Sequence, residues 1–357
     1  MNFQSPKFTA GIKRVLIITT GWVIAALYIR LIQYYTLINA SAPNLPSYYN
    51  LENIFKFTIA EVFFGGIAVA SFEVFYFTDK FRKKSFAYAV IVKSLFYSIS
   101  LTVLSYVIYY IESVYFNELH KFIFNNISVV LAMNFFTWSL IFLITEFTLQ
   151  VSDKYGQGVL MNFILGKYHS PKEEVRIFMF LDMKSSTTIA ESLGNIKYFN
   201  LLNDVFYDIT DAIINTKGEV YQYVGDEIVL SWKFENGIEN ANCVNCIFNI
   251  EKALLLLKEK YMNKFEVLPE FKAGLHFGQV TVGEVGVLKR EITYSGDVLN
   301  TASRIQELCN SYNENLIVSG DLIEKIDLKE LFTTNKIGEI NLRGRSAPVI
   351  LYGVRKK

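Results

Sequence analysis

Two aspartates in the C-terminal half of the chain stand where their carboxylates could act together. Asp182 directly follows an apolar run typical of a buried strand, and Asp226 stands at the turn between two further predicted strands. If the first and second of these strands lie side by side, both carboxylates emerge at one edge of a sheet. Two such carboxylates could hold two divalent cations, which lower the charge on a triphosphate, activate an attacking hydroxyl and stabilise the leaving group. The pattern therefore predicts a metal-dependent phosphoryl-transfer site.

The elements that would position these aspartates alternate between strands and helices. Apolar runs predict strands at residues 175–181, 219–224, 228–232, 271–277, 280–285, 316–318 and 349–352. Helical periodicity is found at 187–216 with a break at Gly194, at 238–261 and at 298–310. Gly278 is expected to separate the strands at 271–277 and 280–285. A βαββαβ core with a peripheral tail accounts for this order, and we expect an α/β domain over residues 175–357.

Four segments of this half resemble motifs of the class III adenylate and guanylate cyclases. Residues 180–187 (FLDMKSST) resemble the first metal-binding motif of that family and residues 223–227 (YVGDE) the second. Residues 274–280 (GLHFGQV) and 295–304 (SGDVLNTASR) match two further family segments. The resemblance covers residues 172–354, with the motifs in family order at family-like spacing. It implies a ferredoxin-like core that converts a purine nucleoside triphosphate into a cyclic nucleotide and pyrophosphate.

The resemblance also implies a role for each matching residue. Asp182 and Asp226 would bind two Mg²⁺ or Mn²⁺ ions per active site. Asn300 would orient the ribose, and Arg304 would stabilise charge on the α-phosphate. The backbone that follows Asp182 would cradle phosphate at a helix N-terminus, and a late arginine would contact the terminal phosphates. These substrate-binding positions are Met183, Lys184, Ser185, Ser186 and Arg345, with Arg343 as a substitute for Arg345.

Family architecture further predicts the oligomeric state. In class III cyclases, the metal-binding residues come from one subunit, and the asparagine and arginine come from the other. This chain carries both sets in one domain, which implies a homodimer with two equivalent sites. The reaction would be attack of the ribose 3′-hydroxyl on the α-phosphorus, promoted mainly by positioning and by the metal ions.

The two positions that read the purine depart from the common family patterns. Gln222 stands where adenylate cyclases usually have lysine, and Thr293 stands where they usually have aspartate, whereas guanylate cyclases typically have glutamate and cysteine. A glutamine amide can donate to adenine N1 or accept from guanine N1–H, and a threonine hydroxyl can also serve either base. These residues leave the base open. The lack of an acidic partner for guanine favours ATP, with a guanylate cyclase as the alternative.

The N-terminal half is much more apolar. Four stretches reach the length of about 20 residues that a transmembrane helix needs, at residues 12–38, 55–77, 87–111 and 127–150. Basic residues gather before the first stretch and between the second and third, so we expect both termini and the catalytic domain on the cytoplasmic side of the cell membrane. Residues 1–150 are thus interpreted as a transmembrane domain within the lipid bilayer, and residues 151–174 as a connector.

Two charges inside these stretches are expected to pair. Glu73 near the inner end of the second stretch and Lys93 near the inner start of the third reach a similar depth at a rise of about 1.5 Å per residue. An unpaired charge in the hydrocarbon is costly, which favours an ion pair within the bundle. The alternative is that each side chain extends to the nearer membrane surface.

The sequence disfavours several other functions. A net charge of +1 gives no electrostatic case for binding nucleic acid. Cys243 and Cys246 have Cys-x-x-Cys spacing, but no second pair follows to complete a zinc site. A diguanylate cyclase is disfavoured because the first glycine of its Gly-Gly-Asp-Glu-Phe signature is missing at residues 224–228. A non-catalytic membrane receptor with a degenerate cyclase domain is disfavoured because Asp182, Asp226, Asn300 and Arg304 are intact, and a domain without activity has no physical need for them.

Overall fold

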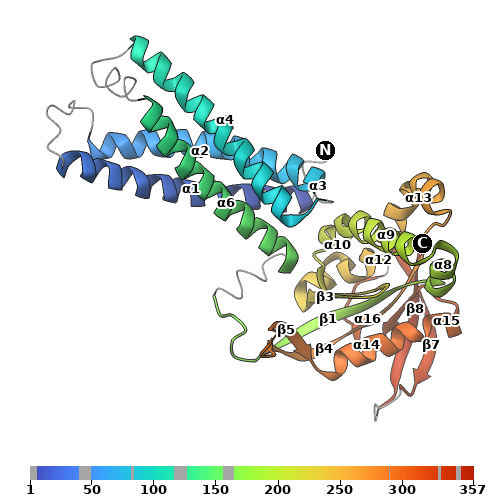
Figure 1. Cartoon of the computed structure of the whole chain (residues 1–357). Coiled ribbons are helices and arrows are strands. Elements are labelled where there is room, and N and C mark those ends of the chain that lie inside the picture. Colours follow the sequence, from blue (N-terminus) through green and yellow to red (C-terminus); the bar gives the residue numbers. More distant parts are fainter. Residues whose placement is uncertain are drawn as a thin grey trace. The chain divides into compact units, whose positions relative to one another are not determined.

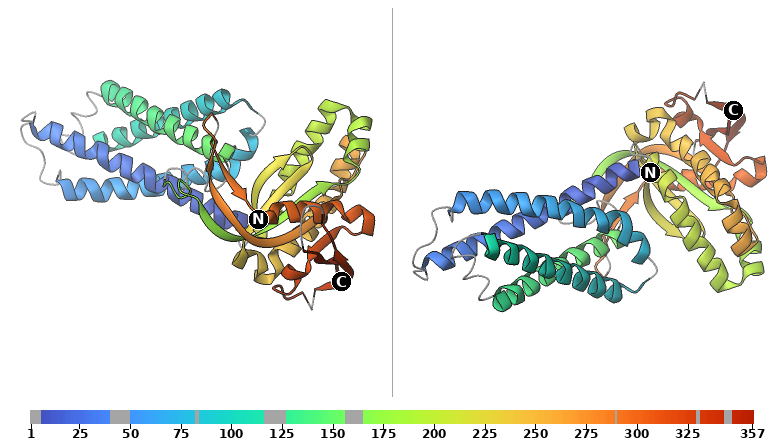
Figure 2. Two further views of the ribbon diagram at one scale, coloured as in Figure 1. Left: turned by 90° about the horizontal axis from the view of Figure 1, so that it is seen from below. Right: turned by 90° about the horizontal axis from the view of Figure 1, so that it is seen from above.

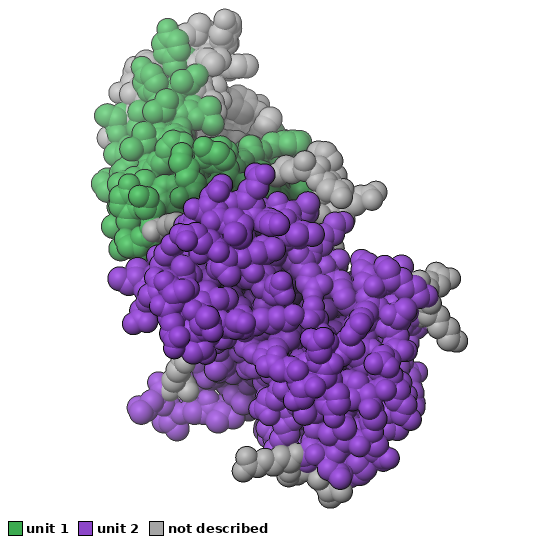
Figure 3. Space-filling view, turned by 90° about the vertical axis from the view of Figure 1, so that its right-hand side faces the viewer, with its two compact units in different colours: residues 1–4, 8–160 green, residues 5–7, 161–357 purple. Residues whose placement is uncertain are grey.

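The structure is a computed structural model, and it describes residues 6–39, 50–81, 84–115, 127–155, 165–288, 290–328, 331–342 and 347–357. The chain divides into two compact units (Figure 3). The first unit holds residues 8–160 together with residues 1–4, and the second holds residues 161–357 together with residues 5–7.

The first unit is a bundle of four long helices that run alongside one another (Figures 1 and 2). They are α1 (Pro6–Asn39), α2 (Leu51–Phe72), α4 (Phe86–Tyr115) and α6 (Ile127–Tyr155). A π-helical turn, η1 (Glu73–Phe77), and the short α3 (Thr78–Phe81) follow α2. In the described part of the chain, four helices are long and apolar enough to cross a membrane. The four apolar helices expected from the sequence are therefore confirmed.

Charged side chains in the interior of this bundle are partnered. Lys93 forms an ion pair with Glu73, and its Nζ lies 3.4 Å from Oε2 of Glu146 on α6. The Tyr97 hydroxyl donates a hydrogen bond of 3.0 Å to Glu73. The predicted pair of Glu73 and Lys93 is confirmed, and Glu146 is a third member that was not predicted from the sequence. The Lys93 ammonium between the two carboxylates lowers the cost of burying these charges among four apolar helices.

The second unit is built on a mixed sheet that has eight strands in its described residues, in the order β2-β3-β1-β4-β6-β8-β7 with β5 paired to β4. Among the strand pairs formed by described residues, only β4 and β6 run parallel. The strands are β1 (Lys172–Met183), β2 (Glu219–Val224), β3 (Glu227–Lys233), β4 (Phe271–Val285), β5 (Glu291–Ser295), β6 (Leu316–Ser319), β7 (Phe332–Ile340) and β8 (Val349–Lys356).

Helices cover both faces of this sheet (Figure 1). Alternate residues of β1 point to opposite sides, with Ile177 and Leu181 in the larger core and Phe178 in a smaller one with Val298. The helices are α8 (Ser186–Leu193), α9 (Asn195–Asp208), α10 (Thr210–Asn215), α11 (Phe234–Ile238), η2 (Glu239–Ala241), α12 (Asn242–Leu256), α13 (Lys258–Phe265), α14 (Asp297–Glu307), α15 (Cys309–Tyr312) and α16 (Gly320–Ile323). The expected α/β fold with a βαββαβ core is confirmed.

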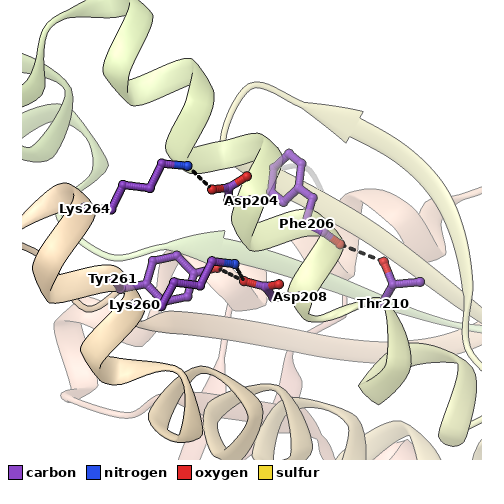
Figure 4. A network of polar contacts seen from close by, with 7 residues as sticks. All are labelled: Asp204, Phe206, Asp208, Thr210, Lys260, Tyr261 and Lys264. Carbon is purple, nitrogen blue, oxygen red and sulfur yellow. Dashed lines mark hydrogen bonds and ion pairs between the residues drawn. The ribbon is translucent and has the colours of Figure 1, made fainter. Parts of the chain in front are cut away.

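Polar contacts join α9 to α13 at the edge of the larger core (Figure 4). Asp204 pairs with Lys264, and Asp208 pairs with Lys260. The buried Tyr261 donates a hydrogen bond of 2.6 Å from its hydroxyl to Asp208. These contacts hold α9 against α13, and α8 connects α9 to the turn after Asp182.

Two details of the predicted sheet are wrong. The strands at 271–277 and 280–285 form one continuous strand, β4, which runs through Gly278. A Cβ at this residue would lie 2.8 Å from Cγ2 of Val298, so glycine is required for the approach of α14 and not for a turn. The first and second strands are also not neighbours, because β3 lies between β1 and β2.

Candidate active site

The two predicted metal-binding aspartates meet at one edge of the sheet. Asp182 lies near the end of β1, where it pairs in register with Glu227 at the start of β3. Asp226 occupies the turn that joins β2 to β3, directly before Glu227. Gly225 in this turn has φ of 64°, a conformation that glycine adopts without steric cost. The expected convergence is therefore present, although β3 and not β2 brings it about.

Negative charge is crowded at this edge. Burial raises the pKa of Asp182, and the nearby Asp226 carboxylate adds to the rise. Burial together with the carboxylates of Asp182 and Asp226 raises the pKa of Glu227 to about 6. Burial and the same two carboxylates also raise the pKa of Tyr198 on α9, which places this phenol beside them. A cation bound here would relieve the repulsion among these groups.

Two further side chains contact Asp182 directly. The Lys272 ammonium on β4 lies 3.2 Å from Oδ2 of Asp182, and the Gln306 amide on α14 donates a hydrogen bond of 3.1 Å to the same oxygen. Neither residue was predicted from the sequence. The register of β1 against β4 places Lys272 opposite Asp182, and this pairing depends on strand order.

The donor set fits a hard divalent cation. Carboxylate oxygens are the ligands that Mg²⁺ and Mn²⁺ prefer, and Mg²⁺ is often held by one or two carboxylates together with substrate phosphates and water. Within the described ranges, no group of three or more His, Cys, Asp or Glu side chains could by itself enclose a metal ion.

The segment after Asp182 turns sharply from strand into helix. Met183 is the last residue of β1 and is buried, while the Lys184 ammonium contacts Asn315 at 2.6 Å and Glu270 at 3.3 Å. Ser185 has the left-handed backbone conformation, and Ser186 is the first residue of α8. The side chains of Met183 and Lys184 are thus held by the protein, and Ser186 forms a side-chain hydrogen bond with Tyr198 of α9.

The predicted ribose and phosphate residues lie on a different element. Asn300 and Arg304 are four residues apart on α14, so they share one face of that helix, with Asn300 exposed and Arg304 half-buried. Among the residues that the structure describes, neither forms a hydrogen bond or ion pair with Asp182 or Asp226. Arg343 and Arg345, predicted to contact the terminal phosphates, lie outside the described residues.

The two predicted base-reading residues, Gln222 and Thr293, lie on β2 and β5, and a tyrosine adjacent to each of them contacts the other tyrosine. Gln222 is exposed on β2, and Thr293 is half-buried on β5. The rings of Tyr221 and Tyr294, each adjacent to one of these residues, meet edge to face with centroids 5.0 Å apart. The Tyr294 amide donates a hydrogen bond of 3.4 Å to the Tyr221 hydroxyl.

The cysteines take no part in this site. Cys243 and Cys246 are fully buried on α12, and Cys309 is buried on α15, all as free thiols. Burial raises the pKa of Cys246 and of Cys309 to about 12. Thiols of this kind are inert at neutral pH.

Comparison with known proteins identifies the family. The family described as the adenylate and guanylate cyclase catalytic domain matches residues 167–355, which is more than half of the chain. The chain belongs to this family. Cyclase-family structures agree in fold: the structure of a bacterial light-regulated adenylyl cyclase matches with a TM-score of 0.53 and 23% identity, over 61% of this chain and 64% of that one.

Curated relatives of this cyclase-family chain include two bacterial enzymes. Adenylate cyclase 2 of Rhizobium meliloti (strain 1021) is 30% identical over 199 residues, which are 56% of this chain and 55% of the relative. Adenylate cyclase of Anabaena cylindrica is 28% identical over 184 residues, which are 50% of this chain and 36% of the relative. The chain thus spans about half or less of the length of these relatives.

Proposed function

We propose that the protein is an adenylate cyclase that converts ATP into 3′,5′-cyclic AMP and pyrophosphate. The convergence of Asp182 and Asp226 at one edge of a cyclase-family sheet is the observation that carries this proposal. The similarity to two curated adenylate cyclases supports it. The choice of ATP also follows from Gln222 and Thr293, since neither supplies the acidic group that would pair with guanine N1–H and N2–H₂.

Asp182 and Asp226 would hold two Mg²⁺ or Mn²⁺ ions. Bound there, the ions would lower the charge on the triphosphate, activate the 3′-hydroxyl and stabilise the pyrophosphate leaving group. The backbone amides of Ser185 and Ser186, at the start of α8, would bind phosphate, because the Lys184 amide already donates a hydrogen bond to the Glu270 carbonyl. Lys272 lies beside Asp182 and would add positive charge where phosphate oxygens must gather.

Asn300 would orient the ribose so that its 3′-hydroxyl faces the α-phosphorus, and Arg304 would stabilise charge that develops on the α-phosphate. The family resemblance supports a site completed by a second copy, because class III cyclases take the metal-binding residues from one subunit and the asparagine and arginine from the other, and this chain carries both sets. We therefore propose a homodimer with two equivalent sites, each made of Asp182 and Asp226 from one subunit and Asn300 and Arg304 from the other. Arg345, or Arg343 in its place, would contact the terminal phosphates.

The membrane assignment completes the proposal. Residues 1–150 would form a multi-pass domain in the plasma membrane, residues 151–174 a connector, and residues 175–357 the cytoplasmic catalytic domain. The four long apolar helices support the spans, and the lysines and arginines between the second and third spans support a cytoplasmic location for both termini.

Mixed dimers provide a direct test. Full-length chains carrying Asp226→Ala or Arg304→Ala should each be inactive, but a mixture should recover activity because one of the two sites in a mixed dimer has both sets of residues. The matched control mixes Asp182→Ala with Asp226→Ala chains. Both changes fall in the same half-site, so the mixture should stay nearly inactive. If the first mixture recovers no more activity than the control, although the chains associate, the shared interfacial site is wrong.

A further inference from the structure

A buried arginine outside the predicted site joins three parts of the catalytic unit. Arg176 on β1 is 2% exposed, and its Nε donates a hydrogen bond of 2.8 Å to Glu174. Its Nη1 donates a hydrogen bond of 2.7 Å to Glu219 at the start of β2. The guanidinium carbon also lies 5.1 Å from the ring centroid of Tyr294 on β5. A guanidinium suits this position because its donors are rigidly arranged and its flat face stacks on aromatic rings.

These partners flank the two residues proposed to read the purine. Glu219 precedes Gln222 by three residues on β2, and Tyr294 directly follows Thr293 on β5. The register of β2 against β3 shifts between Val220 and Gln222, which marks a β-bulge at this point. Bulges next to active sites re-aim a side chain, so the direction of Gln222 depends on how this short stretch is held.

Aromatic side chains of β2 and β5 pack against each other. Tyr221, at the bulge, packs edge to face on Tyr294, and Phe178 of β1 lies beneath both rings at centroid distances of 6.4 and 5.3 Å. Arg176, Glu219, Tyr221 and Tyr294 are referred to here as the arginine–tyrosine cluster. The cluster thus connects β2, which carries Gln222, to β5, which carries Thr293, through side chains of β1.

The cluster is also bound to the segment that leads into the catalytic domain. Tyr168 is 3% exposed, and its hydroxyl donates a hydrogen bond of 3.1 Å to Glu174, the same carboxylate that accepts from Arg176. The Tyr168 carbonyl accepts a hydrogen bond of 3.1 Å from the amide of Glu284 on β4. Glu284 pairs with Ile292, which directly precedes Thr293 on β5.

We propose that Arg176 is a positioning residue for the purine subsite, and that Tyr168 transmits changes in residues 165–171 of the connector to it through Glu174. This inference rests on the proposed cyclase function. Displacement of residues 165–171 would loosen Tyr168 from Glu174 and Glu284, relax the arginine–tyrosine cluster and change the spacing of Gln222 and Thr293. The connector would thereby set how well the site holds and selects its base.

Two variants of the full-length chain test the proposal. Arg176→Met removes the centre of the cluster, and Tyr168→Phe removes only one hydroxyl. Tyr261→Phe is the matched control, because Tyr261 is also a buried tyrosine whose hydroxyl donates to a carboxylate, that of Asp208 at 2.6 Å. We expect Arg176→Met to raise KM for ATP at least tenfold with a smaller change in kcat, and to lower the preference for ATP over GTP in kcat/KM by about tenfold.

Tyr168→Phe should shift KM and the base preference in the same direction by a smaller factor, and Tyr261→Phe should leave the base preference unchanged. An unchanged preference in both Tyr168→Phe and a folded Arg176→Met would overturn the proposal. It would equally be overturned if the Tyr261→Phe control altered the preference as much as Tyr168→Phe does. If Arg176→Met fails to fold, Tyr168→Phe still decides the question, since the loss of one hydroxyl leaves the packing intact.

A readout without nucleotide separates this inference from the proposed function. Amide hydrogen exchange at residues 219–224 and 291–295 should be faster in Tyr168→Phe than in the wild type, and unchanged in Tyr261→Phe. A wild-type chain that makes no cyclic nucleotide would contradict the proposed function, whatever the exchange result. Unchanged exchange at both strands in Tyr168→Phe, in a chain that does turn over ATP, would overturn the link between connector and cluster alone.

Discussion

A methyl group placed at Gly274 would test how closely α14 must approach the sheet. A Cβ at this position of β4 would lie 2.3 Å from the Gln306 amide nitrogen and 2.6 Å from the Ala302 carbonyl oxygen. Both are backbone atoms of α14, so no side-chain rotation can relieve the overlap. Ordinary van der Waals contact begins at 3.4 Å. To lengthen the 2.3 Å distance between the new Cβ and the Gln306 nitrogen to that value, α14 would have to move away from β4 by about 1.1 Å.

The size of the effect follows from this displacement. Overpacking of a dense interior lowers the free energy of unfolding by about 1–3 kcal/mol. Because the new methyl group overlaps backbone atoms of α14, we expect Gly274→Ala to lie near the upper end, at about 3 kcal/mol. For a domain of this size, that loss lowers the unfolding midpoint by about 6–12 °C. Because α14 carries Asn300 and Arg304, a retreat of about 1 Å should also lower kcat by about 100-fold.

Gly283→Ala is the matched control, since Gly283 lies on the same strand and its nearest neighbour would be Pro171 Cα at an ordinary 3.4 Å. Both variants would be compared with the wild type as full-length chains in lipid nanodiscs, by calorimetry and by cyclic nucleotide formation. Gly274→Ala should lose stability and turnover, and Gly283→Ala should lose little of either. A Gly274→Ala chain with the midpoint and turnover of the wild type would refute the close packing of α14 on β4.

Three further predictions concern other parts of the chain. Lys93→Met leaves two buried carboxylates without their ammonium and should destabilise the helix bundle by about 3–5 kcal/mol in denaturant titrations. Lys56→Met, at an exposed pair with Glu52, should cost under about 1 kcal/mol, and equal losses would contradict a buried ion network. The three cysteines should not react with a thiol reagent at neutral pH until the chain unfolds; rapid labelling of the native protein would show that they are not buried. Burial acts to raise the pKa of Glu174, but hydrogen bonding and charge from Arg176 lower it below its ordinary value. Its stabilising effect is therefore present at neutral pH and is lost as the pH falls below about 4.5, so Glu174→Gln should show a smaller acid-induced fall in unfolding midpoint than the wild type. An identical acid profile would argue against the pairing with Arg176.

Local patterns were sufficient to predict most elements. Apolar runs identified the four long helices, and strands such as β2 were placed to the residue because a Gly-Asp turn bounds them. The break near Gly194 was also predicted, and it separates α8 from α9. The errors arose where tertiary packing decides: Gly278 reads as a turn residue in the sequence, but it is a point of close approach between β4 and α14.

In the candidate site, too, residues with a local sequence pattern were predicted and residues placed by tertiary packing were not. Asp182 and Asp226 could be found because each follows a recognisable local pattern. Lys272 and Gln306 could not be found in this way, because their contacts with Asp182 span 90 or more positions of the chain and depend on strand order. The contact of Glu146 with Lys93 was not predicted for the same reason, because local sequence does not determine which helix faces pack together in a bundle.

Product formation by the purified full-length chain, supplied with Mn²⁺ and with ATP or GTP in separate reactions, would show directly whether the protein is an adenylate cyclase. We predict cyclic AMP from ATP as the dominant product, lost in Asp182→Ala and in Asp226→Ala. Dominant cyclic GMP from GTP would keep the chemistry and reverse the assignment of the base to Gln222 and Thr293. The absence of a cyclic product from either nucleotide would contradict the account and favour a non-catalytic membrane receptor.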